Sequence, residues 1–130
     1  MNFSQSHVRF AGVWMRVVEG SMEEALSFFS LLNWVQVDPP SEYNEFRMSA
    51  GPSGFPVVTL FEQEGIDWGE VRTDECVELF VSDPSAALDN VRRWATSRDQ
   101  ELEVSEEGGL SCLFSISGVF ISQIRFIHYR

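Results

Sequence analysis

Apolar residues recur with two different spacings along this chain, and the spacings predict two helices set among shorter strands. Between Ser21 and Asn33, apolar side chains stand three and four positions apart, which is the spacing of one helical face. Ser21 and Glu24 have the spacing of a capping box at the start of this helix. A second helix is predicted over residues 84–97, with Asp83 as its N-cap and a proline at its first position.

Shorter runs of apolar residues, bounded by turn residues, predict strands around both helices. In the first half of the chain they cover residues 13–18, 34–38, 43–49 and 57–63. In the second half they cover residues 76–81, 101–105, 110–116 and 119–127. Both halves therefore have the order strand, helix, then three strands. This order predicts one α+β domain over residues 1–130, with βαβββ modules at 13–63 and 76–127 and an acidic linker at 64–75.

Several predicted strands carry apolar residues on both faces, so both faces need to be covered. One face can pack on the helices, while the other requires a second sheet, a partner subunit or a ligand cavity. Thr59 and Ser122 stand among aromatic residues on this second face, which is typical of a pocket with a few orienting hydroxyls. The alternative is a filled core in which both hydroxyls bond to the backbone.

The net charge and the amino-acid composition disfavour some classes of binding partner and exclude some kinds of chemistry. The formal net charge is −11, and all nine basic residues are arginine. A surface of this kind disfavours nucleic acids and anionic membranes, and the absence of lysine excludes Schiff-base chemistry and a P-loop lysine. Cys76 and Cys112 lie in apolar runs without CxxC spacing, so we expect buried, reduced thiols. With no signal peptide and no apolar run of membrane-spanning length, the expected location is the cytoplasm.

The module order resembles the vicinal oxygen chelate superfamily. The resemblance rests on two βαβββ modules, with "MEEALSFFSLLNW" after the first strand and "VSDPSAALDNVRRW" at the end of the fifth. The superfamily includes glyoxalase I, extradiol dioxygenases, and bleomycin- and fosfomycin-resistance proteins. The resemblance covers residues 13–127. It implies a curled mixed-sheet cup with the helices on its outer face, and a homodimer.

Enzymes of that superfamily hold a divalent metal with His and Glu from the first, fourth, fifth and eighth strands. On this chain those four positions fall on Trp14 (or Gly12), Thr59, Val77 and Ser122. None of these side chains is a normal ligand for such a cation. The resemblance therefore implies a member without metal ligands and without a cofactor.

Two further observations bear on the metal. The only histidines, His7 and His128, lie near the chain ends and are not expected to be ligands. A one-residue shift of the strand at 76–81 would turn Glu78, instead of Val77, into the cup. Glu78 would even then be an isolated ligand.

The expected function is that of a metal-free binding protein of the glyoxalase and bleomycin-resistance type, with no catalytic residue. It would sequester an aromatic or cationic amphiphilic small molecule in an apolar cup. Arg16 points to the same side and would pair with an anionic ligand, with Glu78, or in a structural ion pair. The residues predicted to bind the ligand are Trp14, Arg16, Phe46, Met48, Thr59, Phe61, Phe120 and Ser122.

Two alternatives belong to other classes of function. The first is a metal-independent isomerase or lyase that uses Glu78 or Glu62 as a base within the cup. The second is a dimerising module whose second apolar face is buried between subunits and whose cup is filled.

Overall fold

The computed structural model of the chain describes residues 13–42, 44–50, 57–62 and 72–128. The first module contains β1 (Val13–Val17), α1 (Met22–Leu31), β2 (Val35–Gln36), β3 (Phe46–Ser49) and β4 (Val57–Glu62). The second contains β5 (Arg72–Val81), α2 (Pro84–Ser97), β6 (Leu102–Glu107), β7 (Ser111–Ile116) and β8 (Ser122–His128). The predicted βαβββ order is therefore confirmed in both modules.

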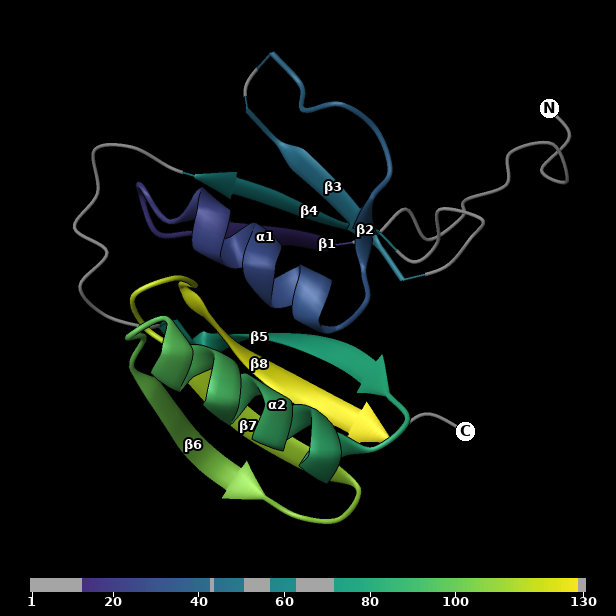
Figure 1. Cartoon of the computed structure of the whole chain (residues 1–130), viewed down its shortest axis with the longest axis vertical. Helices are drawn as coiled ribbons and strands as arrows, with labels where there is room; N and C mark the ends of the chain where they lie inside the picture. Colours follow the sequence, from purple (N-terminus) through teal and green to yellow (C-terminus); the bar gives the residue numbers. More distant parts are fainter. Residues whose placement is uncertain (1–12, 43, 51–56, 63–71, 129–130) are drawn as a thin grey trace, which may run out of the picture.

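Each module forms a four-stranded mixed sheet. The strand orders are β1-β4-β3-β2 and β5-β8-β7-β6. In each sheet the first strand of the module pairs in parallel with the last, and the other neighbours are antiparallel. Figure 1 shows α1 and α2 side by side, both on the same side of the two sheets. No helix in the described part of the chain is long and apolar enough to cross a membrane.

The two sheets meet at the end of β1. The Val18 N–H donates to the Val119 carbonyl at 2.8 Å, and the Ile121 N–H donates to the Arg16 carbonyl at 3.1 Å. The segment directly before Ser122 is predicted as the start of the last strand. In the structure this segment forms the junction between the sheets, and β8 begins at Ser122.

β5 begins earlier than the predicted strand at 76–81. It starts at Arg72, and its pairing with β8 changes register between Arg72 and Cys76. The C-terminal end of the predicted linker at 64–75 is therefore strand, while residues 64–71 lie outside the described part. The prediction was wrong because the acidic composition of this segment is typical of a linker. Its strand conformation depends instead on pairing with β8, which is far away in the sequence.

The two helices begin with different caps. At α2 the prediction is confirmed, because the Ala86 N–H donates to Asp83 Oδ1 at 3.1 Å. At α1 the predicted capping box is wrong. Ser21 occupies the N-cap position, but its Oγ donates to the Gly118 carbonyl at 2.9 Å. Glu24 instead forms an ion pair with the C-cap residue of α2 at 3.0 Å.

Glu62, the last residue of β4, supplies the acceptor for the start of α1. Its carboxylate accepts the Gly20 N–H at 3.1 Å and the Met22 N–H at 3.2 Å. These N–H groups have no carbonyl partner one turn back, and a negative charge there interacts favourably with the helix dipole. Gly20 has a φ of 84°, a conformation that favours glycine in the turn between β1 and α1.

An aromatic cluster forms the centre of the core. Phe28 of α1 is fully buried, and its ring contacts the rings of Phe29, Trp94, Phe114 and Phe120. The Trp94 indole N–H also donates to Ser27 Oγ at 3.0 Å, which satisfies a buried polar group. Because these partners come from both modules, the cluster packs the modules against each other.

Replacing Phe28 by alanine tests how much this cluster stabilises the fold. We expect Phe28→Ala to lower the free energy of unfolding by about 3–5 kcal/mol, because it leaves a cavity among four rings. Phe80→Ala, at a side chain that is 63 % exposed, is the matched control with an expected loss below about 1 kcal/mol. Urea denaturation followed by circular dichroism measures both. Equal losses would contradict the central role of Phe28.

Replacing Glu62 by alanine tests the cap of α1. We expect Glu62→Ala to lower the free energy of unfolding by about 1 kcal/mol, because two N–H groups lose their acceptor. Glu103→Ala, at an exposed carboxylate of β6, should change stability by less than about 0.5 kcal/mol. If the two variants unfold at the same urea concentration, the Glu62 cap contributes nothing to stability.

Candidate functional site

A cavity of about 730 Å³ lies between the first and second sheets, on strands β1, β4, β5 and β8. This volume is within the range of small-molecule sites. The lining residues are Val13, Trp14, Arg16, Phe61, Glu75, Cys76, Val77, Glu78, Phe80 and Ser122.

The alternation of each strand explains which side chains reach the cavity. In β1, Met15 and Val17 are fully buried in the core, so Trp14 and Arg16 project to the opposite face. The same alternation in β4 buries Leu60 and leaves Phe61 at the cavity. The core is therefore on the helix side of the sheets and the cavity on the other.

The same reasoning settles the register of β5. Val77 and Leu79 are buried in the core, although Val77 also borders the cavity. Cys76, Glu78 and Phe80 are exposed and line the cavity. The assignment of Val77 to the inward position was therefore wrong, and Glu78 occupies it. Strand alternation alone does not say which of two apolar faces meets the helices.

A polar cluster joins three strands at one side of the cavity. Arg16 of β1 forms an ion pair with Glu75 of β5. The Ser122 hydroxyl of β8 donates to the second Glu75 carboxylate oxygen at 3.2 Å. Arg16 is therefore in an ion pair within the protein, which was one of the predicted alternatives. The alternative of pairing with Glu78 was wrong, because the carboxylate that Arg16 meets is that of Glu75. Sequence analysis missed Glu75 because it lies in the acidic segment that was interpreted as a linker.

Five of the predicted site residues lie on the cavity side. Trp14, Arg16, Phe61 and Ser122 line the cavity itself. Thr59 is partly buried on the same face of β4 as Phe61, and it is in register with Trp14 of β1. The structure therefore brings most of the predicted set together, and their role in ligand binding stays a prediction.

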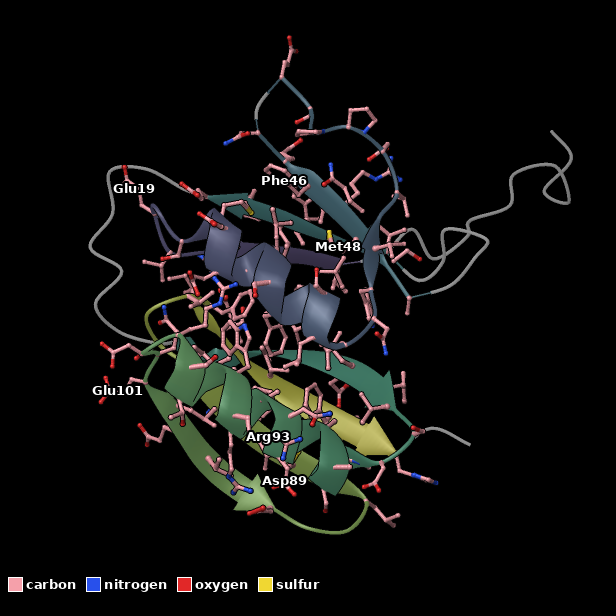
Figure 2. All side chains as sticks on the ribbon, in the orientation of Figure 1. Glu19, Phe46, Met48, Asp89, Arg93 and Glu101 are labelled. Atoms are coloured by element: carbon pink, nitrogen blue, oxygen red, sulfur yellow. The ribbon has the colours of Figure 1, made fainter. Side chains whose placement is uncertain are left out.

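The other three predicted residues, Phe46, Met48 and Phe120, pack in or against the core. Phe46 and Met48 of β3, both labelled in Figure 2, are in register with buried residues of β4 and pack on the helix side. Phe120 is fully buried, and its ring contacts two phenylalanines of α1. Placing them in the cup was wrong, because their periodicity is equally compatible with either face of the sheet.

Two aromatic side chains at the cavity are largely exposed. Trp14 is 60 % exposed and Phe80 is 63 % exposed, although most of the aromatic residues that the structure describes are buried. The Trp14 ring also makes an edge contact with Phe61, with 5.5 Å between centroids. Exposed rings that gather around a cavity are typical of a binding site for an apolar molecule.

The two free cysteines occupy different environments. Cys112 is buried, as predicted, but Cys76 is exposed at the cavity, so the prediction of two buried thiols was wrong for Cys76. Burial raises the pKa of both thiols above the ordinary value. At Cys76 the neighbouring Arg125 guanidinium acts in the opposite direction, but desolvation is the larger effect.

The donor groups that the structure describes at the cavity do not form a set that fits a divalent metal. In the described part of the chain, no three His, Cys, Asp or Glu side chains gather closely enough to hold one. Glu75 is already bound by Arg16 and Ser122, which leaves Glu78 and Cys76 as donors among the described lining residues. His128 lies at the end of β8, where its Nδ1 is 3.0 Å from the Ser82 carbonyl, and His7 lies outside the described residues.

Solved structures with the same fold include a glyoxalase I and a fosfomycin resistance protein. The trypanothione-dependent glyoxalase I of Leishmania major is 17 % identical, with a TM-score of 0.64 over 94 % of this chain and 87 % of that one. The fosfomycin resistance protein FosX of Listeria monocytogenes is 11 % identical, with a TM-score of 0.61 over 95 % and 93 %. FosX has also been solved in complex with Mn(II) and sulfate, and that structure matches with a TM-score of 0.59.

These neighbours belong to the vicinal oxygen chelate superfamily, so the chain has the fold of that superfamily and the predicted resemblance is confirmed at the level of the fold. No family model and no curated protein sequence matches the chain.

Alkylation distinguishes the two cysteines. We expect iodoacetamide to modify Cys76 in the folded protein and Cys112 only after unfolding, because only Cys76 is exposed. The thiolate is the reactive form, so a raised pKa lowers the reactive fraction at neutral pH. The rate at Cys76 should therefore keep rising at pH values where a free cysteine has levelled off. Mass spectrometry of the protein and of Cys76→Ser measures this; rapid alkylation at neutral pH would contradict it.

Proposed function

We propose that the chain is a metal-free binding protein that holds an aromatic or cationic amphiphilic small molecule in the cavity between its two sheets. The observation that carries the proposal is the pair of exposed rings, Trp14 and Phe80, at a cavity of about 730 Å³. Covering these rings with an apolar ligand removes their surface from water, at roughly 25 cal/mol per Å².

The polar groups of the cavity would orient the ligand. The Arg16, Glu75 and Ser122 cluster stands at one side of the cavity, and Glu78 stands among the aromatic side chains. A few fixed polar groups in an apolar site give orientation, while the rings supply most of the affinity. Binding of this kind requires no chemistry from any residue.

A metal-independent isomerase or lyase is the second candidate. It needs a carboxylate base in the cavity, and of the two predicted bases only Glu78 is there. Glu62 is engaged at the start of α1, where its carboxylate accepts two backbone N–H groups. The volume of the cavity supports an open cup over a filled one, and homodimer formation stays a prediction.

Calorimetric titration with an aromatic probe tests the binding function. We expect N-phenyl-1-naphthylamine, a neutral aromatic, to bind saturably at one site per chain. Trp14→Ala should weaken binding roughly fivefold, because an aromatic contact contributes about 1 kcal/mol. Val35→Ala, at an exposed apolar residue of β2 outside the cavity, is the control and should bind like the unmodified chain.

Two results would contradict the proposal. One is the absence of saturable binding by N-phenyl-1-naphthylamine and by aromatic cations alike. The other is stoichiometric binding of Mn²⁺, Ni²⁺ or Zn²⁺ with no response to organic compounds, which would return a metal-dependent enzyme to consideration.

A further inference from the structure

The charges around the cavity are not balanced. The described arginines on this side of the sheets, Arg16, Arg47 and Arg125, are each paired with a carboxylate. Arg16 pairs with Glu75, and Arg125 of β8 pairs with Glu106 at 3.0 Å. Glu78 lines the same cavity, and within the described part of the chain its carboxylate has no hydrogen-bond or ion-pair partner. Among the described residues, the charge left over in the cavity is therefore negative.

Arg125 is placed where it could neutralise Glu78, but the two side chains do not form an ion pair. Arg125 is the β8 residue in register with Glu78, so it is the neighbour best placed to neutralise it. Its guanidinium bonds instead to Glu106 of β6 and also lies close to the Cys76 thiol of β5. The carboxylate of Glu78 thus remains available at the cavity.

The surroundings of Glu78 are aromatic. Phe80 lies two positions along β5 and projects from the same face, and Trp14 of β1 lines the cavity from the first sheet. Both rings are mostly exposed. The face of an aromatic ring attracts a cation, and an ammonium close to a carboxylate gains a direct ionic attraction as well. An anion would meet the unpaired Glu78 and would have to compete with Glu75 for Arg16.

We infer that Glu78 determines the specificity of this cavity, and that it selects apolar cations: protonated or quaternary amines carried on an aromatic body. This inference rests on the proposed binding function and deepens it by naming the charge of the ligand and the residue that recognises it. The rings hold the apolar body, and Glu78 binds the ammonium group. The formal net charge of −11 adds a longer-range attraction, which salt screens.

Three naphthalene probes with different head groups test the inference by calorimetry. They are 2-naphthylmethyl-trimethylammonium, 2-naphthylmethanol and 2-naphthylacetate, which are cationic, neutral and anionic respectively. We expect the cation to bind roughly tenfold more tightly than the alcohol, and the acetate most weakly. Raising the salt concentration should weaken binding of the cation and leave the alcohol unaffected.

Variants assign the preference to one residue. Glu78→Gln keeps the shape of the side chain and removes its charge, so the affinity for the cation should fall roughly fivefold while that for the alcohol stays within about twofold. Glu103→Gln removes the same charge from β6, away from the cavity lining, and should retain the full preference. Circular dichroism confirms that both variants are folded.

The outcomes separate this inference from the proposed function. Equal binding of the cation and the alcohol, or an unchanged preference in Glu78→Gln, would overturn the role of Glu78 and leave the binding function intact. Tighter binding of the acetate than of the cation would also overturn the role of Glu78, and would indicate that Arg16 binds the ligand. If none of the three probes binds, both the binding function and the inference fail.

Discussion

Packing of the two helices on one face of the sheets is the constraint on which the rest of the structure depends. A strand turns successive side chains to opposite faces, so each residue buried beneath a helix sends its neighbours to the other side. Met15 and Val17 face the core, and Trp14 and Arg16 consequently line the cavity. The same rule in β5 buries Leu79 and exposes Glu78 and Phe80. The strand residues that pack against the helices therefore determine which side chains line the cavity.

Long-range contacts hold this arrangement together. Phe28 of α1 contacts rings from the second module, and Trp94 of α2 donates a hydrogen bond back to Ser27. Glu62 ties the end of β4 to the start of α1, where a cap close in sequence was expected. Together these contacts place β1 and β4 opposite β5, and the cavity lies between them.

The fold alone does not decide the function. Glyoxalase I and FosX have the same fold at 17 % and 11 % identity, and FosX has been solved with Mn(II). In the described part of this chain, no three His, Cys, Asp or Glu side chains gather closely enough to hold a metal. Among the described residues, its cavity combines exposed aromatic rings, an arginine paired with Glu75, and the unpaired carboxylate of Glu78. Because function resides in the site, these side chains are the basis of the proposed binding of an organic molecule.

Much of the fold was determined by the sequence alone. The periodicity of residues 84–97 and the Asp83 cap specify α2, since both depend on neighbours within a few positions. The repeated βαβββ order and the superfamily resemblance follow from local patterns of this kind. Trp14, Arg16, Phe61 and Ser122 were placed at the cavity by the same patterns.

The remaining features depended on the tertiary structure. Phe46, Met48 and Phe120 pack with the core instead of lining the cup, because a strand that is apolar on both faces does not encode which face meets a helix. Glu75 and Glu62 gained their roles from partners far away in sequence. Glu78 faces the cavity because the packing of Val77 and Leu79 sets the register of β5, and local sequence cannot report that packing.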